Sequence, residues 1–146
     1  MISMRKSRGS SSHEQASDVV RVLLDTQIAI WWLIKPEAIT KATQALVQTA
    51  TAVFVSRASL WEMAIKCGLG KLRIDLSLFC EHIERTGFHW LDIKQEHILH
   101  LTALPVFHDH KDPFDRLLIA QSWQEPMIFL TADSKLARYG ANIRST

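Results

Sequence analysis

The sequence contains only two cysteines, Cys67 and Cys80, which are too few and too far apart for a disulfide framework or a zinc knuckle. It also lacks an apolar run long enough to span a bilayer, an internal repeat and a glycine-rich phosphate loop. These absences argue against a disulfide-stapled secreted domain and against a membrane-spanning protein. A reducing cytoplasm is the simplest expected location.

A strong excess of charge of one sign is absent as well. The formal net charge is +2 and the isoelectric point is about 8.7, which is mildly basic and far from the excess of a dedicated nucleic-acid coat protein. Removing residues 1–20 takes away three basic and two acidic groups and leaves a charge of +1. Charge alone therefore gives no argument for RNA binding.

The first twenty residues differ from the rest, because they hold six serines and three basic residues but little apolar content. This composition predicts a disordered leader over residues 1–20, without the apolar centre of a secretory signal. Residues 21–146 are enough for one domain with a sheet covered by helices.

Short β-rich runs alternate with helical segments along this domain. The expected strands are residues 19–24, 52–56, 89–93, 127–130 and an edge strand at 141–144. The expected helices are residues 28–34, 39–49, 57–67, 76–86, 96–103 and 113–123, followed by a short helical turn at 134–139. Such alternation is typical of parallel strands joined by right-handed crossovers. The sequence therefore predicts an α/β fold, with a central parallel sheet flanked by helices on both faces.

Four acidic residues lie at or just beyond the ends of different expected strands: Asp25, Glu62, Asp115 and Asp133. The carboxyl ends of parallel strands gather at one edge of a sheet, where open α/β folds bind their ligands. Carboxylates crowded there repel one another, which should raise at least one of their pKa values, and they attract a cation. A hard divalent ion such as Mg²⁺ suits such an all-oxygen site and supports phosphodiester hydrolysis. The pattern predicts a metal-dependent ribonuclease.

Each acid also has an ordinary structural explanation. Asp25 and Asp133 stand where a helix N-cap is favoured, and Asp112 is followed by Pro113 at a first helical position. Asp115 would then lie in the first turn, where the helix dipole favours a carboxylate. Capping alone could therefore account for these positions.

Glu62 lies inside an expected helix, where capping cannot explain it. Ser59, Glu62 and Lys66 share one helical face. The ordinary alternative is an exposed Glu62–Lys66 pair, worth a few tenths of a kcal/mol. The other interpretation is that this face lines the sheet edge and directs Glu62 at a metal.

Four stretches of the sequence, in order, resemble PIN domains and more narrowly the VapC toxin branch. They are Leu23–Thr26, Ser59–Lys66 with Gly68–Leu72, His110–Gln121, and Leu130–Asp133. The resemblance extends from about Val22 to Tyr139. It implies a PIN-like, Rossmann-like α/β/α sandwich with Mg²⁺- or Mn²⁺-dependent endoribonuclease activity, restrained by a VapB-like antitoxin.

The resemblance places the family's acidic residues, which bind metal and serve catalysis, on Asp25, Glu62, Asp115 and Asp133. Asp112 competes with Asp115 for one of these roles. Asp115 is chosen because the residues after it match the family's helix pattern, which leaves Asp112 as a cap or supporting residue. Three supporting side chains are expected around the ligands: Thr26, Asp112 and Thr131.

Candidates for RNA backbone contacts are Lys66, Lys71 and Arg116, and beyond them Arg57, Arg73 and Lys111. Solvated surface charge is the alternative for each. Two or three phosphate contacts would give a modest salt dependence. Selectivity is expected for unstacked bases in a loop rather than for a duplex.

Several alternatives stay open. The His108–His110 segment, or His97 with His100, could bind a transition metal, although neither set has the ligand count of a zinc site. Trp31, Trp32 and Trp61 are expected in the core or at a partner interface, and a homodimer contact or antitoxin groove is expected near Trp31 and Trp32. One rival function is another metal phosphoesterase or a flap-type DNA nuclease, and the small size disfavours the DNA nuclease. The other rival is a non-catalytic RNA-binding or regulatory scaffold.

Overall fold

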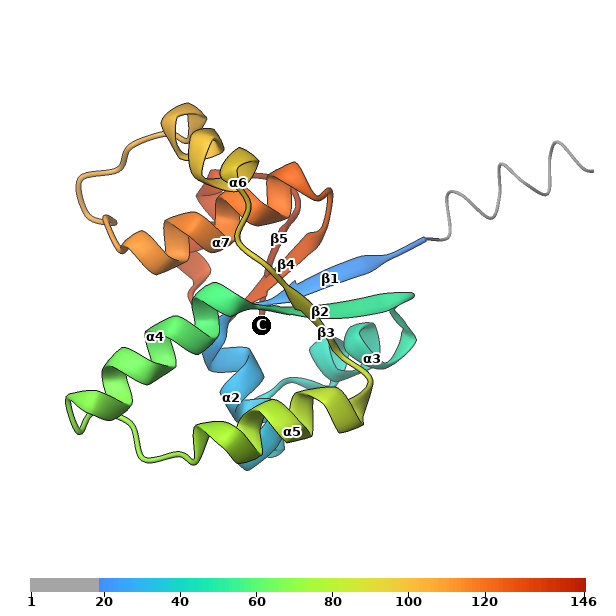
Figure 1. Ribbon diagram of the computed structural model, residues 1–146. Helices are drawn as coiled ribbons and strands as arrows, with labels where there is room; N and C mark the ends of the chain where they lie inside the picture. The colour runs from blue at the N-terminus through green and yellow to red at the C-terminus, as the bar shows by residue number, and fades with distance from the viewer. Residues whose placement is uncertain (1–18) are drawn as a thin grey trace, which may run out of the picture.

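The computed structural model describes residues 19–146, and its centre is a five-stranded sheet in which every neighbouring pair of strands is parallel (Figure 1). The strands are β1 (Arg21–Leu24), β2 (Ala52–Ser56), β3 (His89–Leu91), β4 (Ile128–Thr131) and β5 (Ile143–Ser145). Their order across the sheet is β3-β2-β1-β4-β5. The predicted parallel α/β sheet is confirmed. The predicted leader at 1–20 falls, except for Val19 and Val20, outside the described residues.

Helices cover both faces of the sheet, as predicted (Figure 1). The α-helices are α2 (Thr26–Ile34), α3 (Lys41–Thr49), α4 (Arg57–Gly68), α5 (Leu76–Thr86), α6 (Gln95–His100) and α7 (Pro113–Gln124). Three 3₁₀ segments join them: η1 (Pro36–Ala38), η2 (Leu101–Ala103) and η3 (Ser134–Tyr139). Helices α2, α3 and α5 lie on one face, and α6 and α7 lie on the other. Within residues 19–146, every helix is too short or too polar to cross a membrane.

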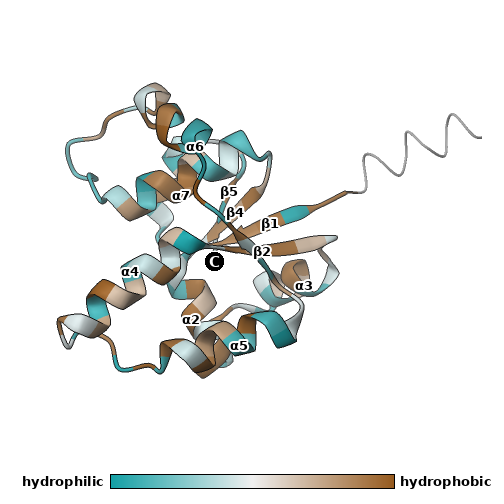
Figure 2. Ribbon diagram, viewed as in Figure 1, coloured by the Kyte–Doolittle hydropathy of each residue, from teal (hydrophilic) through white to brown (hydrophobic). Residues whose placement is uncertain are grey.

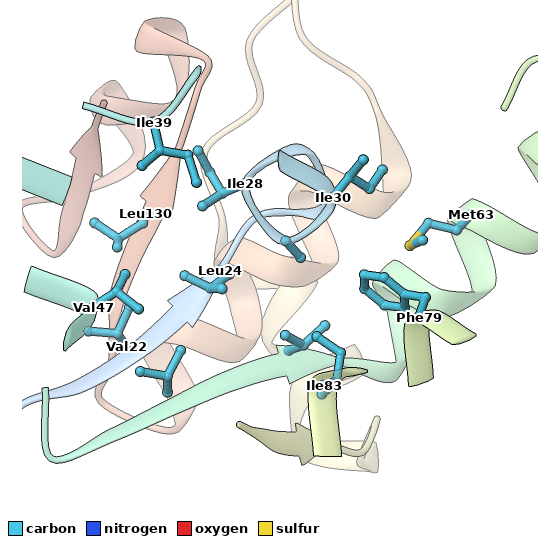
Figure 3. Packing of buried hydrophobic residues seen from close by; sticks show 13 residues of the cluster. Val22, Leu24, Ile28, Ile30, Ile39, Val47, Met63, Phe79, Ile83 and Leu130 are labelled. Atoms are coloured by element: carbon cyan, nitrogen blue, oxygen red, sulfur yellow. The ribbon is translucent and has the colours of Figure 1, made fainter. Parts of the chain in front are cut away.

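The core has two halves because successive side chains of a strand point to opposite faces. On β1, Val22 and Leu24 pack with α2, α3 and α5, whereas Leu23 packs with α7 and Phe129 on the other side. Figure 2 shows the apolar strands enclosed between helices whose outer faces are more polar. Figure 3 shows the first half, in which Phe79 and Ile83 of α5 approach the sheet beside Met63 of α4. Both halves are needed to hold β1 at the centre.

Two expected helices begin later or end earlier than the pattern predicted. The helix expected over 39–49 begins at Lys41, because the Thr40 hydroxyl caps it by accepting from the Thr43 N–H at 3.3 Å. The helix expected over 96–103 is α-helical only to His100 and continues as the η2 turn. Neither difference moves a candidate site residue.

Gly87 ends α5 in the left-handed conformation, with φ of 84°. An added Cβ would meet no neighbouring atom, so the cost of Gly87→Ala is conformational. We expect a loss of about 1 kcal/mol in the free energy of unfolding, measured by urea denaturation. Gly68→Ala is the matched control, because Gly68 is helical and also surrounded by open space, and it should be neutral or stabilising. Equal losses in the two variants would contradict this explanation.

Candidate functional site

The strand order places a reversal between β1 and β4, and this is the position where open α/β sheets bind ligands. The chain runs outward from β1 to β3 and then returns to β4 on the other side of β1. Asp25 directly follows β1, and Thr131 ends β4. The Thr131 hydroxyl donates to Asp25 Oδ2 at 2.6 Å, and the Asp25 N–H donates to the Leu130 carbonyl at 2.8 Å. Asp25 is thus fixed at the switch point.

Asp25 is buried and carries the largest pKa change among the acids described here. It caps α2 as expected, because Oδ1 accepts the Thr26 N–H at 2.7 Å. Burial raises its pKa from 3.8 to about 6, and the charges of Asp115 and Glu62 add to the increase. The hydrogen bonds from Thr131 and Thr26 partly oppose it. The predicted rise of a carboxylate pKa is present, but burial contributes more to it than repulsion does.

Glu62 lies on α4 and is also buried, with 8% of its surface exposed. Its Oε1 accepts from the Thr26 hydroxyl at 2.8 Å, and Thr26 Oγ1 lies 2.8 Å from Ser59 Oγ. Its Oε2 lies 3.0 Å from Lys66 Nζ. The i,i+4 pair that the sequence offered as an ordinary explanation therefore forms. Yet Glu62 is turned inward toward Thr26, as the other interpretation required.

Asp115 lies in the first turn of α7, and its Oδ2 is 3.0 Å from His110 Nε2. Burial raises its pKa, and the charges of Asp112 and Glu62 act in the same direction, while His110 lowers it. The Asp112 side chain caps α7 by accepting the Asp115 N–H at 2.9 Å. The expected cap at Asp112 is confirmed.

Asp133 is placed differently from the other three acids. Its carboxylate caps η3 by accepting the Lys135 N–H at 3.0 Å. Its own N–H donates to the Thr131 hydroxyl oxygen at 3.0 Å, which links it to Asp25 through one side chain. The charge of Asp133 is not among the largest causes that shift the pKa of Asp25 or Asp115. The structure thus groups Asp25, Glu62 and Asp115, which we call the acidic site, and leaves Asp133 at its border.

The acidic site suits a hard divalent cation in its chemistry. It offers only carboxylate oxygens as charged donors, and the pKa values of Asp25 and Asp115 are raised, mainly by burial and further by neighbouring negative charges. In residues 19–146, however, no three acidic, imidazole or thiolate groups are close enough together to hold a metal ion as they stand. Mg²⁺ or Mn²⁺ fits this donor set because both prefer carboxylate oxygen.

Residues 22–142 match the family model described as "PIN domain". The chain belongs to the PIN domain family. The Leu23–Thr26, Ser59–Lys66, His110–Gln121 and Leu130–Asp133 stretches all fall inside the match, so the predicted family is confirmed. The PIN-like α/β/α architecture is confirmed with it.

Solved structures with the same fold include three toxin–antitoxin complexes. VapBC2 from Rickettsia felis, bound to a DNA fragment from its promoter, has a TM-score of 0.61 and 14% identity, covering 87% of this chain and 98% of that one. A toxin–antitoxin complex from Klebsiella pneumoniae has a TM-score of 0.57 and 20% identity, covering 85% and 96%. DNA-bound VapBC from Salmonella typhimurium has a TM-score of 0.58 and 13% identity, covering 88% and 98%. A comparison with curated proteins gave no significant match. At these identities the similarity shows the fold of this PIN domain.

The basic residues of the PIN domain that were expected to contact RNA differ in their availability. Lys66 pairs with Glu62, and Arg57 pairs with Asp92 at 3.1 Å. Arg116 is half-buried and held against the protein, because it donates to the Pro105 carbonyl at 2.8 Å and to the Tyr139 hydroxyl oxygen at 3.3 Å. The exposed candidates with no ion pair among the described residues are Lys71, Arg73 and Lys111.

The structure places the tryptophans and the candidate metal-binding histidines in different surroundings. Trp31 and Trp32 pack against the core of the PIN domain, whereas Trp61 is 55% exposed. Of its two expected placements, the core is thus excluded for Trp61, and the partner interface stays a prediction. Trp61 lies on the exposed face of α4 and contacts Phe114 of α7 edge to face, with ring centroids 5.0 Å apart. The candidate transition-metal histidines His97 and His110 already use both ring nitrogens in contacts with protein groups.

Sequence reasoning missed two residues beside the acidic site. The sequence indicates His110 only as part of a possible transition-metal segment, and it gives Tyr139 no role. In the PIN domain fold, His110 Nδ1 lies 2.7 Å from the Tyr139 hydroxyl, and both side chains are buried. The only available signal was that Tyr139 is the single tyrosine of the chain.

Proposed function

We propose that this PIN domain is a metal-dependent endoribonuclease of the VapC type, which cleaves RNA phosphodiester bonds with a metal-activated water. The observation that supports this most directly is the acidic site. It gathers three carboxylates from the ends or faces of β1, α4 and α7 at the switch point of the sheet, and the charge of Glu62 raises the pKa values of both Asp25 and Asp115. Burying like charges together costs free energy unless a cation binds among them, so binding of a cation would stabilise this site.

Mg²⁺ or Mn²⁺, when bound, supplies a water of lowered pKa and neutralises charge that develops on the phosphate. Asp25, Asp115 and Glu62 are the residues that would hold it, with Asp133 as a further candidate at the border. The Thr131 hydroxyl orients Asp25, and the Thr26 hydroxyl orients Glu62. Because protein groups only position the metal and water, no protein nucleophile is required.

The RNA strand would be held by charge and by stacking. Lys71, Arg73 and Lys111 are exposed and can contact phosphates, and Lys66 becomes available if a metal takes its place beside Glu62. The exposed face of Trp61 gives an unpaired base a stacking surface close to the acidic site. These contacts favour single-stranded loops as substrate.

The proposed partners are a VapB-like antitoxin and a second copy of the chain, in the cytoplasm. Exposed apolar side chains on α2 and α4 and after α4 support a protein partner: Ile34, Trp61, Ile65 and Leu69. The three structures with this fold are themselves toxin–antitoxin complexes.

The deciding experiment removes and restores the metal. Purified protein should cleave a labelled single-stranded or hairpin RNA in Mg²⁺ or Mn²⁺, lose cleavage in EDTA, and regain it when the ion is added in excess. Cleavage products are resolved on a denaturing gel. Cleavage that persists in EDTA would contradict the proposal.

Glu62→Gln, purified in parallel, guards against a contaminating nuclease. It keeps the size of Glu62 and one oxygen for the Thr26 hydroxyl, but removes the charge and the ion pair with Lys66, so it should cleave far more slowly at equal metal concentration. RNA binding that is insensitive to metal, without any cleavage, would instead support a non-catalytic scaffold.

A further inference from the structure

A chain of hydrogen bonds reaches Asp115 from the loop before α7 and from η3. His110 is 8% exposed and Tyr139 is 4% exposed. His110 Nε2 lies 3.0 Å from Asp115 Oδ2, and His110 Nδ1 lies 2.7 Å from the Tyr139 hydroxyl. Arg116 then donates to the Tyr139 oxygen at 3.3 Å. Four side chains are thus joined in a line that ends on a carboxylate of the acidic site.

The direction of each bond in this line can be worked out from its ends. Arg116 has only donors, so the Tyr139 oxygen accepts from it and directs its own proton at His110 Nδ1. An ionised Asp115 only accepts, so His110 Nε2 must carry the hydrogen. A ring with its proton on Nε2 satisfies every donor and acceptor of this line. The tautomer of His110 is therefore set by Asp115 and Tyr139 together.

The line is also rigidly held. Tyr139 packs edge to face against Phe107, with centroids 5.0 Å apart, and against the His110 ring, with centroids 5.4 Å apart. Phe107 and His110 form an isolated antiparallel bridge, with the His110 N–H donating to the Phe107 carbonyl at 3.1 Å. The loop before α7 is thereby locked to η3. A ring fixed in this way leaves the Asp115 carboxylate little freedom to rotate.

We propose that Tyr139, acting through His110, is a positioning residue that holds Asp115 ready to bind a divalent cation. The proposal rests on the proposed metal-dependent function. The bond from His110 uses Oδ2 of Asp115, so the same contact aims the remaining oxygen and fixes the plane of the carboxylate. Partners of this kind around a ligand typically change metal affinity 10- to 100-fold.

Tyr139→Phe tests the proposal because it removes only the hydroxyl. The protein is titrated with Mn²⁺, and the free ion is quantified by electron paramagnetic resonance. The Mn²⁺ affinity should fall about tenfold in the variant. In ¹⁵N-labelled protein without metal, the His110 ring should show its proton on Nε2, and this preference should weaken in the variant. His110→Gln, which can still offer an N–H to Asp115, should retain more Mn²⁺ affinity than His110→Ala.

Phe107→Leu is the matched control, since it disturbs the same aromatic packing but leaves the hydrogen-bonded line intact. Its Mn²⁺ affinity should stay within about twofold of the wild type, which is a smaller change than the loss of about tenfold expected for Tyr139→Phe. An equal loss in Phe107→Leu and Tyr139→Phe would overturn the proposal, as would a wild-type ring protonated on Nδ1. Unchanged Mn²⁺ affinity in Tyr139→Phe would overturn it too, whereas a wild type that binds no Mn²⁺ would instead defeat the proposed nuclease function.

Discussion

Asp25→Asn is expected to reduce RNA cleavage at least about a hundredfold and, in the absence of metal, to make the protein more stable at neutral pH. Both effects have one origin. The buried carboxylate of Asp25 supplies charge for the cation, and the same charge is costly while no cation is present. Asparagine keeps the size and one acceptor for the Thr26 N–H or the Thr131 hydroxyl but removes the charge. The gain in the free energy of unfolding should be about 2 kcal/mol at pH 7.5.

The sign of this effect depends on pH in a defined window. The folded protein holds the Asp25 proton with a pKa of about 6, while the unfolded chain releases it near 3.8. Between these values the folded state binds more protons, so the contribution of Asp25 to stability falls as pH rises. The penalty is complete above pH 6 and absent below 3.8. The advantage of Asp25→Asn should therefore shrink as pH falls from 7.5 toward 4.

Urea denaturation of both proteins at several pH values, in EDTA, measures this difference. Asp75→Asn is a suitable control, because Asp75 caps α5 from an exposed position, accepting the Leu78 N–H at 3.1 Å, and is not part of the acidic site. Its stability should differ little from the wild type at every pH. Adding Mg²⁺ should stabilise the wild type more than Asp25→Asn. A variant that is less stable than the wild type at pH 7.5 would show that the carboxylate is not under electrostatic strain.

His97→Ala should cost about 3 kcal/mol of stability, although His97 lies away from the acidic site. The ring is fully buried. Its Nδ1 accepts the Lys94 N–H at 3.0 Å and lies 3.2 Å from Gln121 Nε2, while its Nε2 lies 2.7 Å from Glu125 Oε2. Removing the ring would leave these groups without partners and create a cavity between α6 and α7.

The loss reaches the sheet because Gln121 also accepts the Ser56 hydroxyl at 2.6 Å, at the end of β2. Thermal or urea unfolding measures the cost. His100→Ala is the control from the same helix, since that ring is half-buried and stacks on the exposed Trp123. It should cost less than about 1 kcal/mol. Similar losses in the two variants would mean that water replaces the His97 contacts.

The fold and the positions of the acids were predictable because they depend on local pattern. Asp25 follows an apolar run of β length, and Asp112 precedes a proline at a helix start, so a strand end and a cap could be located from short stretches. Parallel strands then bring distant carboxylates to one edge. The structure adds the order of the strands, which determines which strand ends lie next to one another at that edge.

Other parts of the site depend on contacts between distant segments, which no local pattern specifies. Trp61 appears apolar and helical in sequence, yet it lies on the outside because the buried face of α4 is the one that carries Ser59, Glu62 and Met63. The bond between His110 and Tyr139 joins the loop before α7 to the last residue of η3. The burial that raises the Asp25 pKa likewise appears only when the sheet and the helices are assembled.

The bond between Asp25 and Thr131 spans 106 positions of the chain. A ribosome making this protein therefore produces the first carboxylate 106 positions before the hydroxyl that orients it. A growing polypeptide cannot complete the centre before β4 emerges. The proposed nuclease is in this way inactive until β4 has been made, which leaves time for an inhibitor to be in place.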